Sequence, residues 1–144
     1  MVSVISVISV VHLFLPDGRW ISYQTNESGR YEIAVRAFPP DGRFWQVSAG
    51  GGTHARWSRN GKEWYYLAPD DTLMAVPVNA INSAFRTGPP VRLFTPTLAE
   101  GSSINAFNTQ YDVARDGRFL INISLGGTTT APITLISNWK SPAR

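Results

Sequence analysis

The sequence predicts an all-β protein built from about three similar units of short strands, and three observations lead to this prediction. The 12 glycines and 10 prolines among 144 residues are spread along the chain and leave few windows long enough for a helix. Aromatic residues make up 12% of the chain and charged residues only 16%, which is too apolar for a disordered segment. One turn motif also occurs three times.

Each copy of this motif has Asp or Asn before a glycine and Arg or Lys after it, with apolar residues on both sides. The copies centre on Gly18, Gly61 and Gly117, which stand 43 and 56 residues apart. Asp-Gly and Asn-Gly between apolar runs are strong hairpin signals, because these residues tolerate the positive φ of tight primed turns. We therefore expect three hairpins with primed turns.

The remaining strands are expected before and between the hairpins. Segment 2–11 consists of β-branched residues and Ser and predicts one or two strands. Turn residues such as Pro, Gly and Asp separate the other apolar runs, which predict strands over 31–38, 44–47, 73–78, 91–94 and 133–138. Only 79–86 has the composition of a helical turn.

The first fifteen residues contain no charged side chain and could be taken for an export signal. No Lys or Arg precedes Arg19, however, and the apolar run leads directly into the first predicted hairpin, so we expect a strand and no signal peptide. The run is also too short and too rich in Ser to span a bilayer. We expect no membrane insertion by this chain, and the compartment stays open.

Repeats of about 40 to 50 residues that each hold four short strands are typical of β-propeller blades. The spacing of the motifs therefore predicts about three four-stranded blades, which is half a propeller. The blades are expected over about 7–48, 53–95 and 108–139 of a single partial domain.

Three segments carry a resemblance to a known family: PDGRWISYQTNESGRYEIAVRAFP, GGGTHARWSRNGKEWYYLAPDDTLMAVPV, and YDVARDGRFLIN with the later APITLISNW. They resemble the TolB-like, WD40-like (PD40-type) repeats at the C-terminal end of many bacterial proteins, including the sensor propellers of receptor-type Ser/Thr protein kinases. The resemblance covers residues 14–140. It implies a non-catalytic sensor or interaction module that binds a peptide, a protein or a small molecule, in a family that is often extracytoplasmic.

Such propellers commonly have six or so blades, so three blades would leave two apolar faces and unpaired strand edges. We therefore predict a homodimer in which two chains close a ring of about six blades. In this hypothesis the Val- and Ile-rich segment 2–11 completes the sheet of the partner's last blade.

Candidate binding residues lie on the strands expected nearest the propeller axis. His12 and His54 precede the first and second motif glycines by six and seven residues. Arg56 and Asp112 occupy the same position in the second and third repeats, so neighbouring blades would place their opposite charges side by side. These four residues, together with Asn108, could bind a ligand, and each could instead have a structural role.

An alternative function is a Ca²⁺-dependent hydrolase such as a lactonase, with its site at the axis of the dimeric ring. Carboxylate and amide oxygens are suitable Ca²⁺ ligands. The residues that could surround the channel mouth are Glu100, Asn105, Asn108 and Asp112. No catalytic motif accompanies them, and the recognition module needs no cofactor.

Other classes of function have little support in the sequence. The chain has no Cys, no Gly-x-Ser-x-Gly elbow and no kinase catalytic loop. The segment 50–52 is Gly-Gly-Gly but lacks the Lys of a phosphate-binding loop, so we expect a flexible connector. The net charge of +3 comes from scattered residues, so no nucleic-acid partner is expected. The aromatic residues expected in the core are Trp20, Tyr23, Trp57, Trp64, Tyr66, Phe119 and Trp139.

Overall fold

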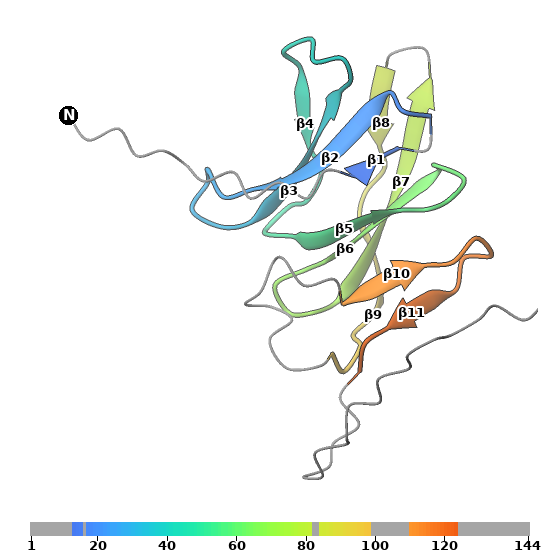
Figure 1. The fold of residues 1–144 in the computed structure, drawn as a ribbon. Coiled ribbons are helices and arrows are strands. Elements are labelled where there is room, and N and C mark those ends of the chain that lie inside the picture. Colours follow the sequence, from blue (N-terminus) through green and yellow to red (C-terminus); the bar gives the residue numbers. More distant parts are fainter. Residues whose placement is uncertain (1–12, 16, 82–83, 99–109, 124–144) are drawn as a thin grey trace, which may run out of the picture.

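The computed structural model describes residues 13–15, 17–81, 84–98 and 110–123, and their regular structure is all β (Figure 1). Among these residues there is no helix long and apolar enough to cross a membrane. The strands are β1 (Leu13–Phe14), β2 (Trp20–Thr25), β3 (Glu32–Ala37), β4 (Phe44–Gln46), β5 (Thr53–Trp57), β6 (Glu63–Leu67), β7 (Leu73–Ile81), β8 (Ala84–Thr87), β9 (Val91–Phe94), β10 (Tyr111–Val113) and β11 (Phe119–Ile121).

The first sheet is an antiparallel meander in the order β1-β2-β3-β4. The register of β2 and β3 runs from Trp20 opposite Ala37 to Thr25 opposite Glu32. Alternation along β3 sends Ile33 and Val35 into the core, because successive side chains of a strand point to opposite faces. The strands expected over 31–38 and 44–47 are confirmed within one or two residues.

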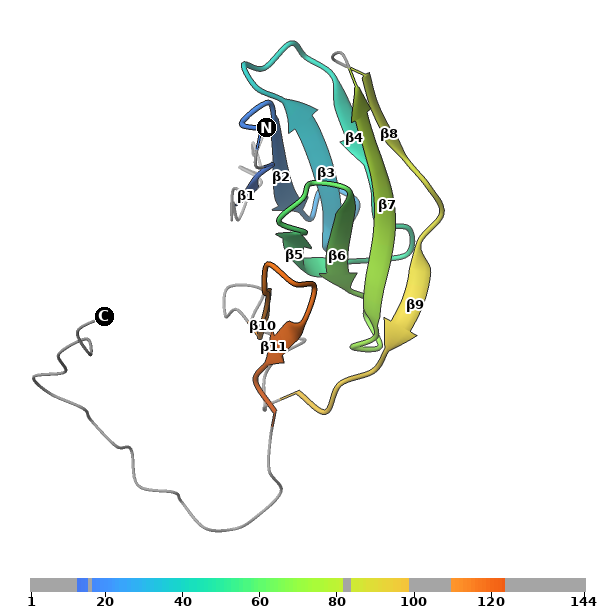
Figure 2. The same ribbon diagram turned by 90° about the vertical axis from the view of Figure 1, so that its right-hand side faces the viewer.

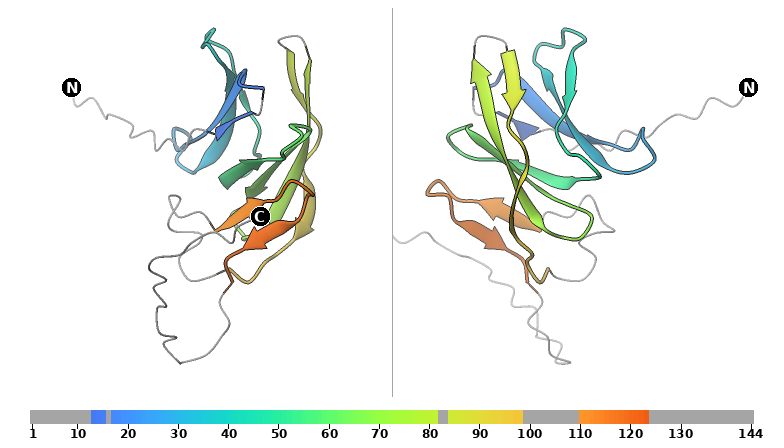
Figure 3. Two further views of the ribbon diagram at one scale, coloured as in Figure 1. Left: turned by 45° about the vertical axis from the view of Figure 1, so that its right-hand side comes forward. Right: turned by 180° about the vertical axis from the view of Figure 1, so that it is seen from behind.

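The second sheet contains β5, β6 and β7, and the nine-residue strand β7 has two successive partners on its far side. The first part of β7 pairs with β9 and its last part pairs with β8 (Figure 3). The helical turn expected over 79–86 is therefore wrong. Phe85 of β8 is buried against the rings of Trp20, Trp45 and Trp57, and this packing overrides a weak local preference.

Strands β10 and β11 form a third antiparallel pair, and an isolated bridge joins Leu98 to Ile123. The three sheets lie one above another in Figure 2, with β1, β5 and β10 along one side and β4, β8 and β9 along the other. The strands expected over 2–11 and 133–138 lie outside the described residues.

Two apolar clusters hold the three sheets together, one on each face of the second sheet. Trp64, Tyr66 and Val76 point toward the first sheet, whereas Tyr65 and Leu67 point toward β10 and β11. The first cluster comprises Leu15, Trp20, Ile33, Val35, Val47, Ala55, Trp57, Trp64, Tyr66, Val76 and Phe85. The second comprises Tyr65, Leu67, Leu73, Ala75, Tyr111 and Val113, with Leu98, Phe119 and Ile121 partly buried against it.

The predicted core aromatics follow this division with one difference. Trp20, Trp57, Trp64 and Tyr66 belong to the first cluster and Phe119 packs against the second. Tyr23 instead lies on the outward face of the first sheet, where the guanidinium carbon of Arg36 stands 4.7 Å from its ring centre. Trp139 lies outside the described residues.

All three motifs form hairpins with the same hydrogen bonds, but the turns are not primed. Only the motif glycines have positive φ, at 70°, 68° and 84°, whereas the preceding Asp17, Asn60 and Asp116 do not. The glycine N–H donates to the carbonyl three residues earlier, and the Asp or Asn side chain accepts the N–H two residues later. This is a type I turn followed by a left-handed glycine, in which the acidic or amide side chain stabilises the loop.

Gly51 and Gly52 of the connector 50–52 are buried and closely packed, so glycine is required there for steric reasons and not only for flexibility. A Cβ on Gly52 would stand 2.8 Å from the Cβ of Ser48 and 2.9 Å from Cδ2 of Tyr66. The N–H of Gly52 donates to the carbonyl of Tyr31 at 2.8 Å. Gly51 has a φ of 112°, which L side chains rarely adopt.

Candidate functional site

The structure brings Arg56 of β5 and Asp112 of β10 together, as the repeat alignment predicts. Arg56 Nε lies 4.0 Å from Asp112 Oδ1, at the side of the molecule where the first strands of the sheets run. The Arg56 side chain is 14% exposed and that of Asp112 is 65% exposed, so the pair is buried on one side and open to solvent on the other. Arg56 NH1 also donates to the carbonyl of Ala55 at 2.7 Å.

His54 lies two residues from Arg56, but it contacts the first sheet and links it to the second through a hydrogen bond. Its backbone N–H donates to Oε1 of the buried Gln24 at 2.7 Å, and its Nδ1 lies 2.9 Å from Thr53 Oγ1. It has a φ of 55° and sits in the bulge of β5 between Thr53 and Arg56. Such a conformation costs about 1 to 3 kcal/mol and persists only where the surroundings fix it.

Two tyrosines that the sequence reasoning did not select flank the Arg56 side chain. Tyr65 lies opposite Arg56 in the register of β5 and β6, and its hydroxyl donates to Glu63 Oε2 at 2.7 Å. Tyr111 directly precedes Asp112, and its buried hydroxyl has no hydrogen-bond partner among the described residues. Their position could have indicated them, because Tyr111 is next to Asp112 in the sequence and Tyr65 lies opposite Arg56 in the strand register.

Burial is the main reason why the pKa of each of these tyrosines lies above its ordinary value. For Tyr65 the hydrogen bond to the Glu63 carboxylate raises the pKa further. For Tyr111 the cation of Arg56 partly opposes the effect of burial. Both phenols are therefore neutral at physiological pH. The edge where β5 and β10 lie, which we call the inner edge, presents the guanidinium of Arg56 and the exposed carboxylate of Asp112, and the two phenols lie buried behind them. A guanidinium and a carboxylate are groups that can form charge-assisted hydrogen bonds.

Four other predicted site residues cannot be placed relative to this edge, since the structure does not describe them. His12, Glu100, Asn105 and Asn108 lie outside the described residues. Among the residues that are described, no three His, Asp or Glu side chains come together as a metal site would require.

A second polar group lies between β3 and the connector that follows β4. The carboxylate of Glu32 is 2% exposed and accepts from Arg30 Nε at 2.6 Å and from Ser48 Oγ at 2.5 Å. Ser48 Oγ also accepts the N–H of Ile33 at 2.8 Å. Burial, and then the charge of Glu32, raises the pKa of Tyr66. The side chains of Arg30, Glu32 and Ser48 are hydrogen-bonded to one another, which is typical of a structural network.

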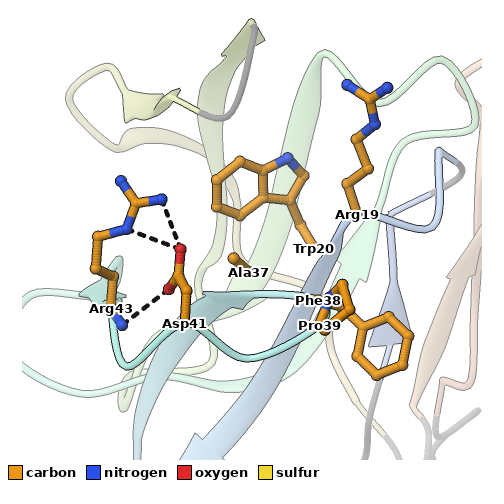
Figure 4. A pocket seen from close by; sticks show the side chains of 7 residues that line it. All are labelled: Arg19, Trp20, Ala37, Phe38, Pro39, Asp41 and Arg43. Atoms are coloured by element: carbon orange, nitrogen blue, oxygen red, sulfur yellow. Dashed lines mark hydrogen bonds and ion pairs between the residues drawn. The ribbon is translucent and has the colours of Figure 1, made fainter.

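Two clefts open on the described surface. One, of about 310 Å³, lies beside the first motif turn and is shown in Figure 4; its lining residues are Arg19, Trp20, Ala37, Phe38, Pro39, Asp41 and Arg43. The other, of about 260 Å³, is lined by Arg30, Tyr31, Gly51, Gly52, Thr53, Leu67, Ala68, Pro69 and Asp71.

No protein-family model matches the chain, and no curated protein matches it.

Proposed function

We propose that this chain is a non-catalytic recognition module built as half of a β-propeller. The observation that carries the proposal is the second sheet, which buries apolar side chains on both faces between two neighbouring sheets. The first strands of the three sheets also run along one side (Figure 2), as the innermost strands of successive blades do. The blades are those expected over about 7–48, 53–95 and 108–139, and the resemblance to TolB-like repeats supports the same architecture.

The two outward faces support closure of a ring by a second copy of the chain. On the first sheet Phe14, Phe38 and Phe44 are 50%, 47% and 63% exposed. On the third sheet Leu120 is 76% exposed. Large apolar side chains on the faces of end blades are typical of surfaces that another blade covers. A homodimer would cover both faces and give about six blades, with segment 2–11 as the added strand.

Ring closure is tested by light scattering after gel filtration at micromolar concentration. The expected species has twice the 15.9 kDa mass of the chain. Leu120→Glu and Phe44→Glu should each give a monomer, whereas Val91→Glu, at an apolar position on β9 that is 50% exposed, should leave the dimer intact. A folded wild-type monomer would overturn ring closure.

In the recognition function, the inner edge with Arg56 and Asp112 contacts a peptide, protein or small polar ligand. A displayed library of random peptides, panned against the protein, tests this role. Enriched peptides should lose binding to Arg56→Gln and retain it with Arg92→Gln, which changes an exposed arginine on β9. Failure to enrich any peptide that depends on Arg56 would count against peptide recognition at this edge.

A further inference from the structure

The cleft of about 310 Å³ beside the first motif turn has a charged rim on two sides of an aromatic floor. Arg19 and Trp20 come from the start of β2, and the segment from Ala37 to Arg43 joins β3 to β4. In Figure 4 the indole of Trp20 lies between Arg19 on one side and Arg43 on the other. The Trp20 side chain is held by the core, because its ring packs against Trp45 and Phe85.

Arg43 is fixed in place by Asp41. The Asp41 carboxylate accepts the backbone N–H of Arg43 at 3.0 Å and side-chain bonds from its Nε at 2.9 Å and NH2 at 2.5 Å. The hydrogen bond to Arg43 keeps the pKa of Asp41 below its ordinary value, so the carboxylate stays ionised. Arg43 has five N–H groups, and the two that Asp41 receives leave three for another acceptor.

Arg19 differs from Arg43 because its guanidinium has no hydrogen-bond or ion-pair partner among the described residues. Its backbone is held, since its N–H donates to Asp17 Oδ1 at 2.9 Å and its carbonyl accepts the N–H of Phe38 at 2.7 Å. The position of the side chain at the rim is therefore set by the motif turn. Two arginines against one aspartate leave the cleft with one uncompensated positive charge.

The wall between the arginines is apolar. Ala37 and Pro39 line it, whereas the ring of Phe38 points away from Trp20 and packs against Phe14 (Figure 4). Small-molecule sites start at about 300 Å³ and combine an apolar lining with a few polar groups. A cleft of this size accepts one ring or branched apolar group with a small polar head, and one free positive charge matches a monoanion better than a phosphate dianion.

We propose that this cleft binds a carboxylate carried on an aromatic or branched apolar group. The carboxylate pairs with Arg19 and takes a further N–H from Arg43, and the apolar group lies against Trp20 and Pro39. A free aromatic acid and the C-terminal residue of a peptide both present this chemistry. The cleft shares no residue with the edge at Arg56 and Asp112, so the inference concerns a separate binding site, and because one sheet of one chain builds it, it does not depend on ring closure.

Calorimetric titration with 2-naphthoate tests the proposal, with 2-naphthalenemethanol as the uncharged match. We expect saturable binding of the acid, at least tenfold weaker binding of the alcohol, and a loss of about tenfold or more in Arg19→Gln, because a charge-assisted pair is removed. Arg118→Gln is the matched control, since Arg118 holds the same place in the third motif and lies outside the cleft. Melting temperatures of both variants show that they fold.

The tripeptide Gly-Gly-Phe, with a free carboxylate or a carboxamide, distinguishes the two sources of the ligand. Tighter binding of the free peptide than of naphthoate, with the same dependence on Arg19, assigns the cleft to peptide C-termini, and the reverse order assigns it to free acids. Absence of saturable binding by either acid, or binding unchanged in Arg19→Gln, would overturn the proposal. The Leu120→Glu variant separates this result from ring closure, because it should bind naphthoate as the wild type does even as a monomer.

Discussion

Phe85 gives the sharpest test of how the first and second sheets pack. It stands on β8 and is 4% exposed, and its ring centre lies 5.0 Å from that of Trp20, 5.7 Å from that of Trp45 and 6.3 Å from that of Trp57. The hairpin of β7 and β8 thus inserts one side chain among three tryptophans. Replacing Phe85 by Ala should remove this joint while leaving the strands themselves intact.

The expected cost follows from burial and from the ring contacts. Truncating a buried Phe to Ala costs about 3 to 5 kcal/mol, and the surrounding tryptophans are too large to fill the space by small shifts. All three ring distances fall within the range of about 4.5 to 7 Å in which aromatic pairs add to burial. We expect Phe85→Ala to lower the free energy of unfolding by about 4 kcal/mol, which corresponds to a fall in Tm of about 10 °C.

The assay is urea unfolding followed by tryptophan fluorescence, with Phe94→Ala as the matched control. Phe94 is 43% exposed and has one ring contact, with Phe119 at 5.8 Å, so its loss should cost about 1 kcal/mol. The midpoint for Phe85→Ala should fall at an unchanged slope. If Phe85→Ala costs no more than Phe94→Ala, the hairpin of β7 and β8 does not pack between the sheets and the described core is wrong.

Three further predictions concern the connector, the buried carboxylate and alkaline stability. Gly52→Ala should lower the free energy of unfolding, measured by thermal unfolding, by about 1 to 3 kcal/mol because its Cβ would overlap Ser48. Gly88→Ala is the control, and it should cost less than about 1 kcal/mol because the nearest atom to its Cβ would be 3.3 Å away. Equal effects of the two variants would contradict the packing of the connector. Ser48→Ala should cost about 1 to 3 kcal/mol by removing a donor to Glu32 and an acceptor for a buried backbone N–H, and an unchanged urea midpoint would refute the network. The raised pKa of Tyr111 keeps its phenol protonated in the folded protein, whereas the phenol of the unfolded chain ionises near pH 10. The contribution of this group to the free energy of unfolding is therefore fully present below about pH 10 and falls above it by about 1.4 kcal/mol per pH unit. Tyr111→Phe should reduce this fall between urea midpoints measured at about pH 8 and pH 11, and an unchanged fall would refute the burial of a neutral Tyr111 phenol.

Much of the fold was predictable because its signals are local. The turn motif places Asp or Asn, Gly and a basic residue in an order that one type of turn requires, and all three copies adopt that turn. The primed geometry was wrong because the Asp or Asn before each glycine has no positive φ, so the glycine alone takes the left-handed conformation. The strand at 84–87 was missed for a different reason, since its partner surface comes from Trp20, Trp45 and Trp57, which are distant in sequence.

The candidate site was predictable to the extent that it follows from the repeats. Aligning the motifs placed Arg56 and Asp112 in equivalent positions, and the structure sets them 4.0 Å apart. Nothing in the alignment indicated the role of His54, because a bulge in β5 turns its backbone toward Gln24. The cleft at Arg19 was also missed, since its walls come from two segments about twenty residues apart that meet only when β2 pairs with β3.

Strand β5 carries polar contacts to both of its neighbouring sheets. His54 bonds through its backbone to Gln24 of the first sheet, and Arg56 faces Asp112 of the third. Apolar faces favour the stacking of two sheets, but a small sliding motion between such faces changes the free energy little. A buried amide oxygen that loses its N–H donor, in contrast, raises the free energy by about 1 to 3 kcal/mol. The His54–Gln24 bond therefore fixes the position of β5 against the first sheet more firmly than the solvent-exposed Arg56–Asp112 contact fixes it against the third. The Asp112 carboxylate is held locally, because its Oδ1 accepts the N–H of Val113 at 2.8 Å, so the contact with Arg56 depends on how β10 lies against β5.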